Sequence, residues 1–256
     1  MKGQSSRPYP GTSIAHIPGT SIDPIPGPDP GPTTHRNVIN DITLYNLLPG
    51  VFDGMQHQSP VKDSGVWCHD LTLKRPGRYL ITAESGTGKS SLCSYIYGSR
   101  RDFTGRLLFD GEDTSTFTPD RWTSLRRDSL AYLPQEMRLF PELSALENIL
   151  IKNRLTDYRT QSEIMQLMQR LEIDNRADFP AGRLSVGQQQ RVAIIRAICQ
   201  PFSFLLLDEP VSHLDERDNS TVASLVTETA DANGAAVIAT SVGNHLQLPD
   251  PVIIRL

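Results

Sequence analysis

The stretch from Arg78 to Ile96 decides the fold and reads RYLITAESGTGKSSLCSYI. Its apolar beginning, Arg78–Thr82, predicts a strand, and its end, Ser91–Ile96, predicts a helix. Between them lies the pattern G-x-x-x-x-G-K-[ST], with Ala83 in the place of the first glycine. Glycines allow backbone N–H groups to turn toward phosphate oxygens, because no Cβ obstructs them. The stretch therefore predicts a phosphate-binding loop; the alternative is a flexible Gly/Ser loop without a ligand.

The residue types of this loop indicate how a nucleoside triphosphate would be held. Lys89 has the reach to contact the β- and γ-phosphates, and the hydroxyl of Ser90 is placed to ligate Mg²⁺. The helix that follows points the positive end of its dipole at the phosphates. The predicted nucleotide-binding residues of the loop are Ala83, Glu84, Ser85, Gly86, Thr87, Gly88, Lys89, Ser90 and Ser91.

Composition is that of a soluble globular protein, with 38% hydrophobic and 21% charged residues in 256. A net charge of −4 gives no reason to expect nucleic acid or an anionic membrane surface as a partner. A locally basic stretch of arginines between Arg100 and Arg127 is interpreted as a solvated face. The three scattered cysteines argue against a disulfide framework and fit a reducing cytosol. Without an apolar run of about 20 residues or the core of a signal peptide, any membrane role is expected to come through a partner.

The first 37 residues differ in composition from the rest of the chain. Residues 1–32 hold eight prolines and five glycines, and an eight-residue repeat starts at Pro10 and again at Pro18. Such a segment cannot bury a core, so residues 1–37 are predicted to be a disordered Pro/Gly-rich tail. An over-long translation start is the alternative.

Residues 38–256 are predicted to form one α/β domain. Short apolar runs alternate with helical segments, which is typical of a parallel sheet buried on both faces. Helical character prevails from Pro141 to Ala181. Further strands are predicted at Ile42–Tyr45, Val66–Leu73, Ser203–Leu207, Ala235–Ala239 and Val252–Ile254.

A second motif, Phe204–Pro210, reads FLLLDEP and ends an apolar strand in two carboxylates. Asp208 is predicted to lie near the Mg²⁺, directly or through water. Glu209 is predicted to orient and polarise the attacking water. A strand that merely stops in a polar turn is the alternative, but a phosphate loop upstream makes it improbable.

A third motif begins a strong helix and reads LSVGQQQR from Leu184 to Arg191. Ser185 has the character of an N-cap. A serine hydroxyl and the free N–H groups of a helix start form an anion site. Alone, the pattern is equally that of a capped helix with a core face.

In their order along the chain, these motifs resemble those of ATP-binding cassette (ABC) ATPase subunits. Leu184–Gln188 resembles the family signature Leu-Ser-Gly-Gly-Gln, Tyr132–Gln135 resembles the Q-loop, and Val211–Asp215 resembles the D-loop. The resemblance covers nearly all of the chain from about residue 40, and is nearest to the lipoprotein-releasing, macrolide-export and cell-division types. It implies an α/β P-loop NTPase (RecA-like) core with a mixed sheet, an antiparallel β subdomain and an inserted α-helical subdomain at about residues 138–184.

The resemblance also implies that the site is shared between two chains. In the family, two cassettes pair head to tail around two ATP molecules, and the phosphate loop of one faces the signature helix of the other. Ser185, Gly187 and Gln188 would then contact the γ-phosphate held by the partner, with Asp215 at the dimer interface. Gln135 would help to hold Mg²⁺ and would lie beside the surface where transmembrane permease subunits dock. An aromatic side chain normally stacks on the adenine, and the candidates are Phe52, which is equally suited to core packing, and then Tyr45.

The chain departs from the family pattern at three positions. Ala83 replaces the first loop glycine, and Val186 replaces the first signature glycine, where its branched side chain narrows the approach of the partner's nucleotide. Ser241 stands where the family places its switch histidine, and a serine neither carries positive charge nor reaches as far. His213 and His245 lie near the site in sequence and are candidate substitutes, although each is more typical of an ordinary surface residue.

The predicted function is that of an ATP-binding subunit that dimerises around ATP and hydrolyses it slowly for a membrane transport or remodelling complex. Its predicted place is cytoplasmic, on the inner face of the cell membrane. The alternative is a regulatory ATP-binding module, weakened in hydrolysis, that gates a membrane partner. A soluble cassette ATPase of translation or DNA repair is a third class, but the tandem cassettes, coiled coil or zinc cysteines usual there are missing from the sequence.

Overall fold

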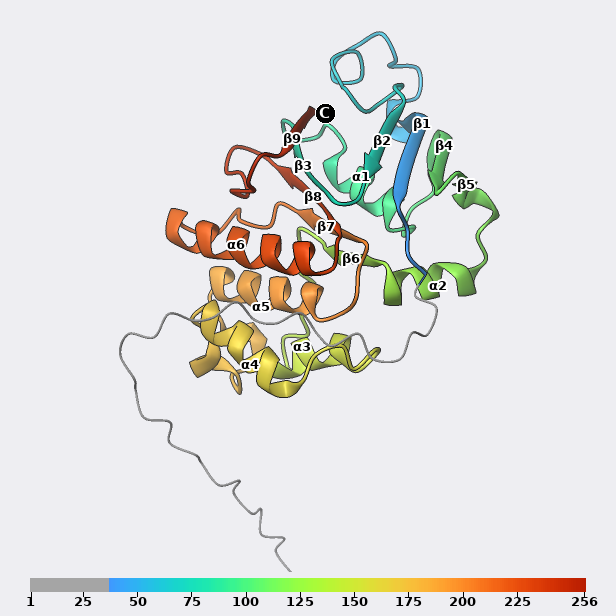
Figure 1. Cartoon of the computed structure of the whole chain (residues 1–256). Helices are drawn as coiled ribbons and strands as arrows, with labels where there is room; N and C mark the ends of the chain where they lie inside the picture. The colour runs from blue at the N-terminus through green and yellow to red at the C-terminus, as the bar shows by residue number, and fades with distance from the viewer. Residues whose placement is uncertain (1–36) are drawn as a thin grey trace, which may run out of the picture.

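Two β-sheets form the frame of the part of the chain that the computed structural model describes, residues 37–256 (Figure 1). The larger sheet has five strands in the order β6-β7-β8-β3-β9, and all of its neighbouring pairs are parallel. Its strands are β3 (Gly77–Thr82), β6 (Leu130–Leu133), β7 (Phe204–Asp208), β8 (Ala236–Ser241) and β9 (Val252–Arg255). The predicted tail, apart from Asn37, lies outside the described residues.

The smaller sheet is antiparallel and has the order β2-β1-β4-β5. Its strands are β1 (Asp41–Pro49), β2 (Leu71–Lys74), β4 (Phe103–Phe109) and β5 (Glu112–Asp113). Parallel and antiparallel pairing therefore both occur, each in its own sheet. The predicted antiparallel β layer corresponds to this smaller sheet.

Six α-helices accompany the sheets in the described part of the chain. They are α1 (Lys89–Ile96), α2 (Pro119–Asp128), α3 (Ala145–Asn153), α4 (Gln161–Arg170), α5 (Val186–Ile198) and α6 (Glu216–Ala232). Both α3 and α4 fall in the predicted helical segment, and each begins with a complete capping box, Ser144 with Glu147 and Thr160 with Glu163. Helix α5 begins at the predicted N-cap Ser185. Turns of 3₁₀ helix lie at Gly50–Phe52, Thr114–Thr116, Asp174–Arg176 and Ala181–Arg183.

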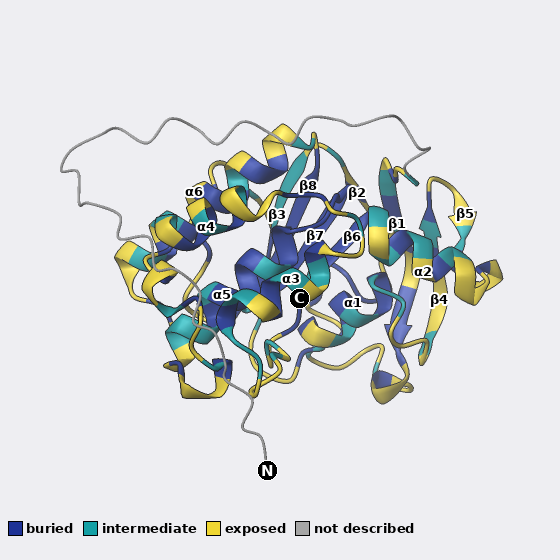
Figure 2. Ribbon diagram, turned by 90° about the horizontal axis from the view of Figure 1, so that it is seen from below, coloured by how far each residue is buried: buried dark blue, intermediate teal, exposed yellow. Residues whose placement is uncertain are grey.

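The parallel sheet separates two apolar cores. Successive side chains of a strand point to opposite faces, and β7 follows this rule: Leu205 and Leu207 join the core with α3 to α6, while Phe204 and Leu206 join the core with α1 and β1. Every residue of β7 and β8 is buried, as the dark strands at the centre of Figure 2 show. Burial on both faces explains why these strands read as continuous apolar runs.

The strand predicted at Val66–Leu73 is wrong for its first half, because only Leu71–Lys74 pairs as β2. Cys68 has a φ of 59°, which breaks an extended chain. The N–H groups of Val66 and Trp67 donate to Ser64 Oγ, at 3.0 and 2.8 Å, instead of to a neighbouring strand. The apolar character that suggested a strand serves core packing, since the Trp67 ring is completely buried.

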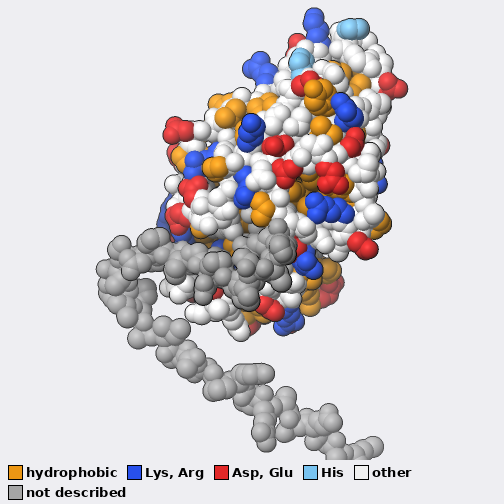
Figure 3. Space-filling view, turned by 45° about the vertical axis from the view of Figure 1, so that its right-hand side comes forward, with side chains coloured by type: hydrophobic (Ala, Val, Ile, Leu, Met, Phe, Trp, Pro, Cys, Tyr) orange, Lys and Arg blue, Asp and Glu red, His pale blue; other side chains and the backbone are white. Residues whose placement is uncertain are grey.

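The surface mixes charges of both signs. On the face shown in Figure 3, acidic and basic side chains are interspersed with apolar ones. Within residues 37–256, none of the helices combines the length and apolar character needed to cross a bilayer.

Candidate functional site

The phosphate loop connects the end of β3 to the start of α1, as predicted. Gly86 and Gly88 have φ values of 84° and 99°, which disfavour side chains larger than glycine. A Cβ on Gly88 would lie 3.0 Å from the Trp67 ring and 3.3 Å from the Phe52 ring. Gly88 is also the N-cap of α1 and supplies no side-chain cap. The first turn of α1 therefore has N–H groups for an anion to bind.

Lys89 lies between the loop and the carboxylate of Glu209, the residue that follows β7. Its Nζ donates to the carbonyl of Glu84 at 2.9 Å and lies 3.7 Å from Glu209 Oε1. Only 6% of the Lys89 side chain and 16% of the Glu209 side chain are exposed. Partial burial strengthens the attraction between these charges. The structure thus brings together the ammonium and the carboxylate that the two motifs predicted.

Asp208 has one oxygen with a partner and one without. Its Oδ1 accepts a hydrogen bond of 2.7 Å from Thr240 Oγ1. Its Oδ2 is buried and has no hydrogen-bond partner in the described part of the chain. A buried carboxylate oxygen without a partner is costly, and a divalent cation would satisfy it. Burial, and then the charge of Asp208, raise the pKa of the Cys93 thiol, so Cys93 remains protonated beneath the site.

Glu209 follows with a left-handed backbone, φ 52°, which is rare outside glycine and often found at functional sites. Its N–H donates to the carbonyl of Thr240 at 3.2 Å. Its own carbonyl accepts from Nε2 of Gln190 on α5 at 3.1 Å. The Gln190 Oε1 accepts from the N–H of His213 at 3.1 Å. One buried glutamine therefore ties α5 both to Glu209 and to the loop that follows it.

The signature residues lie at the exposed start of α5 and bond to one another. Ser185 Oγ accepts from the N–H of Gln188 at 3.3 Å, and Gln188 Oε1 accepts from the N–H of Ser185 at 3.0 Å. Val186 is 47% exposed. A Cβ on Gly187 would lie 3.2 Å from the carbonyl of His213, so this glycine allows α5 to pack against that loop.

The remaining predicted residues lie at the ends of three other elements. Gln135 is exposed, two residues after the end of β6. Asp215 caps α6 by accepting from the N–H of Asp218 at 2.8 Å. Ser241 ends β8, is buried, and has its Oγ 2.5 Å from Nδ1 of His245.

The structure favours packing over adenine stacking for Phe52. Its side chain is buried, and its ring lies against Gly88 and in the core with Trp67. Tyr45 is more exposed, but the guanidinium of Arg106 lies over its ring, 5.0 Å from the centroid.

Several residues of the site were missed by sequence reasoning. Trp67 Nε1 donates to the carbonyl of Thr87 at 2.9 Å and so holds the phosphate loop from below. Arg196 donates from α5 to the carbonyls of Met137 and Arg138, just after Gln135. Gln190 stood within the signature run, but the motif assigned it no role. Nothing in the local pattern singles out Trp67, Thr240 or Arg196, because their partners are distant in sequence.

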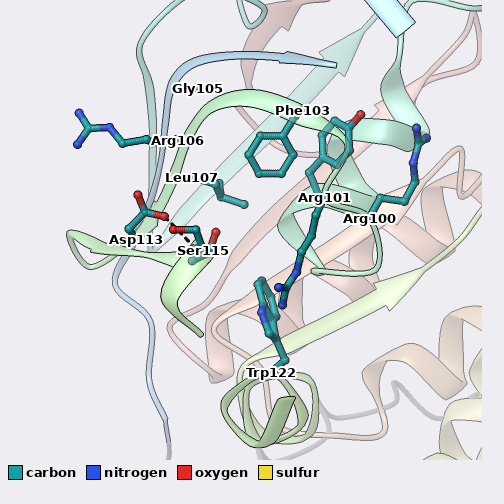
Figure 4. A pocket seen from close by; sticks show the side chains of 11 residues that line it. Arg100, Arg101, Phe103, Gly105, Arg106, Leu107, Asp113, Ser115 and Trp122 are labelled. Carbon is teal, nitrogen blue, oxygen red and sulfur yellow. Dashed lines mark hydrogen bonds between the residues drawn. The ribbon is translucent and has the colours of Figure 1, made fainter. Parts of the chain in front are cut away.

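Only the first part of the basic stretch between Arg100 and Arg127 lines a separate cavity of about 280 Å³ between β4 and α2 (Figure 4). Arg100 pairs with Asp102, Arg101 lies over the Trp122 ring at 5.9 Å, and Arg106 points away from the cavity. These arginines make ion pairs and ring contacts, and the interpretation of the whole stretch as a solvated face stays a prediction.

Comparisons with known proteins agree with this geometry. The family model described as "ABC transporter" matches residues 69–212, more than half of the chain. The lipoprotein-releasing system ATP-binding protein LolD of Granulibacter bethesdensis is 36% identical over 67% of this chain and 76% of its own length. The macrolide export ATP-binding/permease protein MacB of Salmonella typhimurium is 31% identical over 78% of this chain and 30% of its own length.

The similarity extends to a further relative and to two solved structures. An uncharacterized ABC transporter ATP-binding protein of Mycobacterium tuberculosis is 29% identical over 84% of this chain, which spans 64% of that relative's length. A dimeric ATP-binding cassette, solved in a post-hydrolysis state with ADP and Pi, superposes with a TM-score of 0.62 at 26% identity, over 68% of this chain and 78% of that one. A dimeric bacterial ABC transporter cassette superposes with a TM-score of 0.67 at 24% identity, over 84% and 94%, and supports the fold. The chain therefore belongs to the ABC transporter family, as an ATP-binding cassette.

Proposed function

We propose that this chain binds Mg-ATP in its phosphate loop, pairs with a second cassette around the nucleotide, and hydrolyses ATP to drive a membrane transport or remodelling complex. The observation that carries the proposal is the cluster at the end of β7. There the Glu209 carboxylate lies 3.7 Å from Lys89 Nζ, beside an Asp208 oxygen that has no partner in the described part of the chain. These groups match the parts of a phosphoryl-transfer site.

The residues of the cluster have separate tasks in this proposal. Lys89 exchanges its contact with Glu84 for the β- and γ-phosphates. Ser90, Asp208 and Gln135 supply oxygen ligands for Mg²⁺, which neutralises charge on the phosphates when bound. Glu209 holds and polarises the attacking water as Lys89 turns to the phosphates.

A second chain completes the site in this proposal. Ser185, Gly187 and Gln188 lie at the exposed start of α5 and would reach the γ-phosphate bound by the partner cassette, with Asp215 at the interface. Support comes from the dimeric state of the two superposed cassettes. A homodimer is the simplest such assembly.

The membrane partner is proposed to dock in a groove of about 260 Å³ beside the Gln135 loop. The groove presents three cationic side chains, Arg138, Lys152 and Arg196, together with Tyr97, Tyr132 and Ile151. Burial, and then the charge of Arg196, lower the pKa of Lys152 to about 8. A carboxylate on a transmembrane permease subunit would offset the repulsion between Lys152 and Arg196. The chain would then work on the cytoplasmic face of the membrane.

One observation favours the alternative of a regulatory module with weak hydrolysis. Ser241 is 1% exposed at the end of β8, where the family pattern has its switch histidine, and its short side chain carries no positive charge. A site that binds ATP and releases phosphate slowly would serve to gate a partner.

Turnover at saturating Mg-ATP, measured beside Glu209→Gln, tests the proposal. We expect slow but measurable phosphate release by the wild-type protein and a loss of about 10²–10³ in the variant, because one polarising contact is removed. The variant should still bind ATP and accumulate as a dimer. Equal turnover in the two proteins would contradict hydrolysis and leave the regulatory module. Stimulation of ATP turnover by a permease encoded by a neighbouring gene would support coupling of hydrolysis to a membrane partner.

A further inference from the structure

The phosphate loop borders a cavity of about 550 Å³. Glu84 and Thr87 line it from the loop, and Ser241 and His245 line it from the end of β8 and the segment that follows. Arg255 and Asp63 also lie on its wall. His245 and the phosphate loop therefore face the same space.

His245 is held in place from several directions. Its Nδ1 lies 2.5 Å from Ser241 Oγ, and Ser241 is fixed by β8, where it is paired with Thr82 of β3. The carbonyl of His245 accepts from Asn219 Nδ2 on α6 at 2.8 Å. The preceding Asn244 donates to the carbonyl of Val211 at 2.9 Å. A histidine that served only as a polar surface residue would not need these hydrogen bonds, so they indicate that the position of the imidazole matters.

We propose that His245, positioned by Ser241, donates a hydrogen bond from Nε2 to the terminal phosphate of ATP. A serine hydroxyl that donates to Nδ1 leaves the proton of the neutral ring on Nε2, which is then a donor. The buried Ser241 hydroxyl is thus a positioning group, and the imidazole supplies the reach that serine lacks. This inference rests on the proposed binding of ATP by the phosphate loop.

The other histidine near the site does not fit this role. His213 Nδ1 lies 3.0 Å from Ser212 Oγ, and His213 is not among the residues that line the cavity. The Ser241–His245 pair is therefore the arrangement that the cavity supports.

Binding of fluorescent ATP and ADP analogues, without turnover, tests the inference. We expect His245→Ala to weaken ATP binding about 10-fold, because a hydrogen bond to a charged group is lost, and to leave ADP binding unchanged. Ser241→Ala should lose part of the same preference, and Ser241→Thr, which keeps the hydroxyl, should retain it. The double variant should lose no more than His245→Ala, because the two residues act as one unit. His57→Ala, at an exposed histidine of another loop, is the control.

Replacing His245 by glutamine or asparagine distinguishes a direct contact with the phosphate from a merely structural role. The glutamine amide reaches about as far as Nε2, whereas the asparagine amide reaches only about as far as Nδ1. We expect His245→Gln to keep part of the preference for ATP over ADP and His245→Asn to lose it as His245→Ala does.

Equal changes in ATP and ADP binding, or none, in His245→Ala would overturn the inference while the proposed function stands. Retention of the preference by asparagine and not by glutamine would also overturn it. Wild-type protein that binds neither nucleotide would overturn the proposed function and the inference with it.

Discussion

The starts of helices α1 and α5 are built in opposite ways. Helix α1 follows Gly88, which has a left-handed backbone and no side-chain cap. Helix α5 follows Ser185, which exchanges two hydrogen bonds with Gln188 in a complete capping box. The first helix start has N–H groups without a side-chain cap, whereas at the second the capping box satisfies the N–H groups of Ser185 and Gln188.

Their surroundings differ as much as their caps. Lys89 and Thr87 at the first helix start are buried, and Trp67 supports the loop from beneath. At the second, Ser185 and Val186 are exposed. This difference indicates that the phosphate loop, which has left-handed glycines and no side-chain cap, depends on buried contacts within the chain. The start of α5, which we propose to face a second chain, keeps its conformation through its own capping box. In the proposed two-chain site, each chain would contribute one helix start of each kind.

The largest expected effect concerns the glycines of the phosphate loop. Gly88→Ala should lower the free energy of unfolding by about 2–4 kcal/mol, from left-handed strain and a Cβ forced against the Trp67 and Phe52 rings. Gly86→Ala shares the strain, but its Cβ meets nothing within 4 Å, so it should cost only about 1–2 kcal/mol. Urea denaturation of the nucleotide-free proteins measures both. Equal losses of stability would show that the Trp67 and Phe52 rings move aside for the added Cβ at no cost.

A second, smaller effect isolates the hydrogen bond beneath the loop. Trp67→Phe removes the Nε1 donor to the Thr87 carbonyl. Trp122→Phe is a matched control, because its indole is also buried but its Nε1 has no partner within the described residues. Trp67→Phe should cost about 1 kcal/mol more than Trp122→Phe and alone should weaken ATP binding. The two variants are compared by thermal melting and nucleotide titration, and identical behaviour would deny the brace a role.

The two helix starts also show how far the sequence could be interpreted. Both were predictable, because phosphate loops and N-caps obey short-range rules of spacing and residue type. The continuous apolar runs of β7 and β8 likewise predicted buried parallel strands, because burial on both faces removes the alternation.

The contacts that brace the site were not predictable, because they join residues far apart in the chain. Trp67 and Thr87 are 20 residues apart, and Gln190 and Glu209 are 19 apart. The apolar residues around Trp67 predict a strand but form a turn, because they serve packing while Ser64 and the positive φ of Cys68 set the backbone. The approach of His245 to Ser241 depends on loop contacts to α6 that no local pattern reports.

The smallest expected effect on stability concerns Val186 at the exposed start of α5. Val186→Gly removes a branched side chain that is 47% exposed and so should change the free energy of unfolding by only about 0.5 kcal/mol. If this surface meets the nucleotide of a second chain, a smaller residue allows a closer approach. We therefore expect tighter ATP-dependent dimerisation of the variant, measured by light scattering in the Glu209→Gln background so that ATP persists. Weaker dimerisation would mean that the valine makes an apolar contact across the interface. The start of α5 would then contribute apolar packing between the two chains as well as contacts to the nucleotide. The two helix starts would differ in packing as well as in hydrogen bonding, because the apolar contacts of the phosphate loop before α1 lie within its own chain.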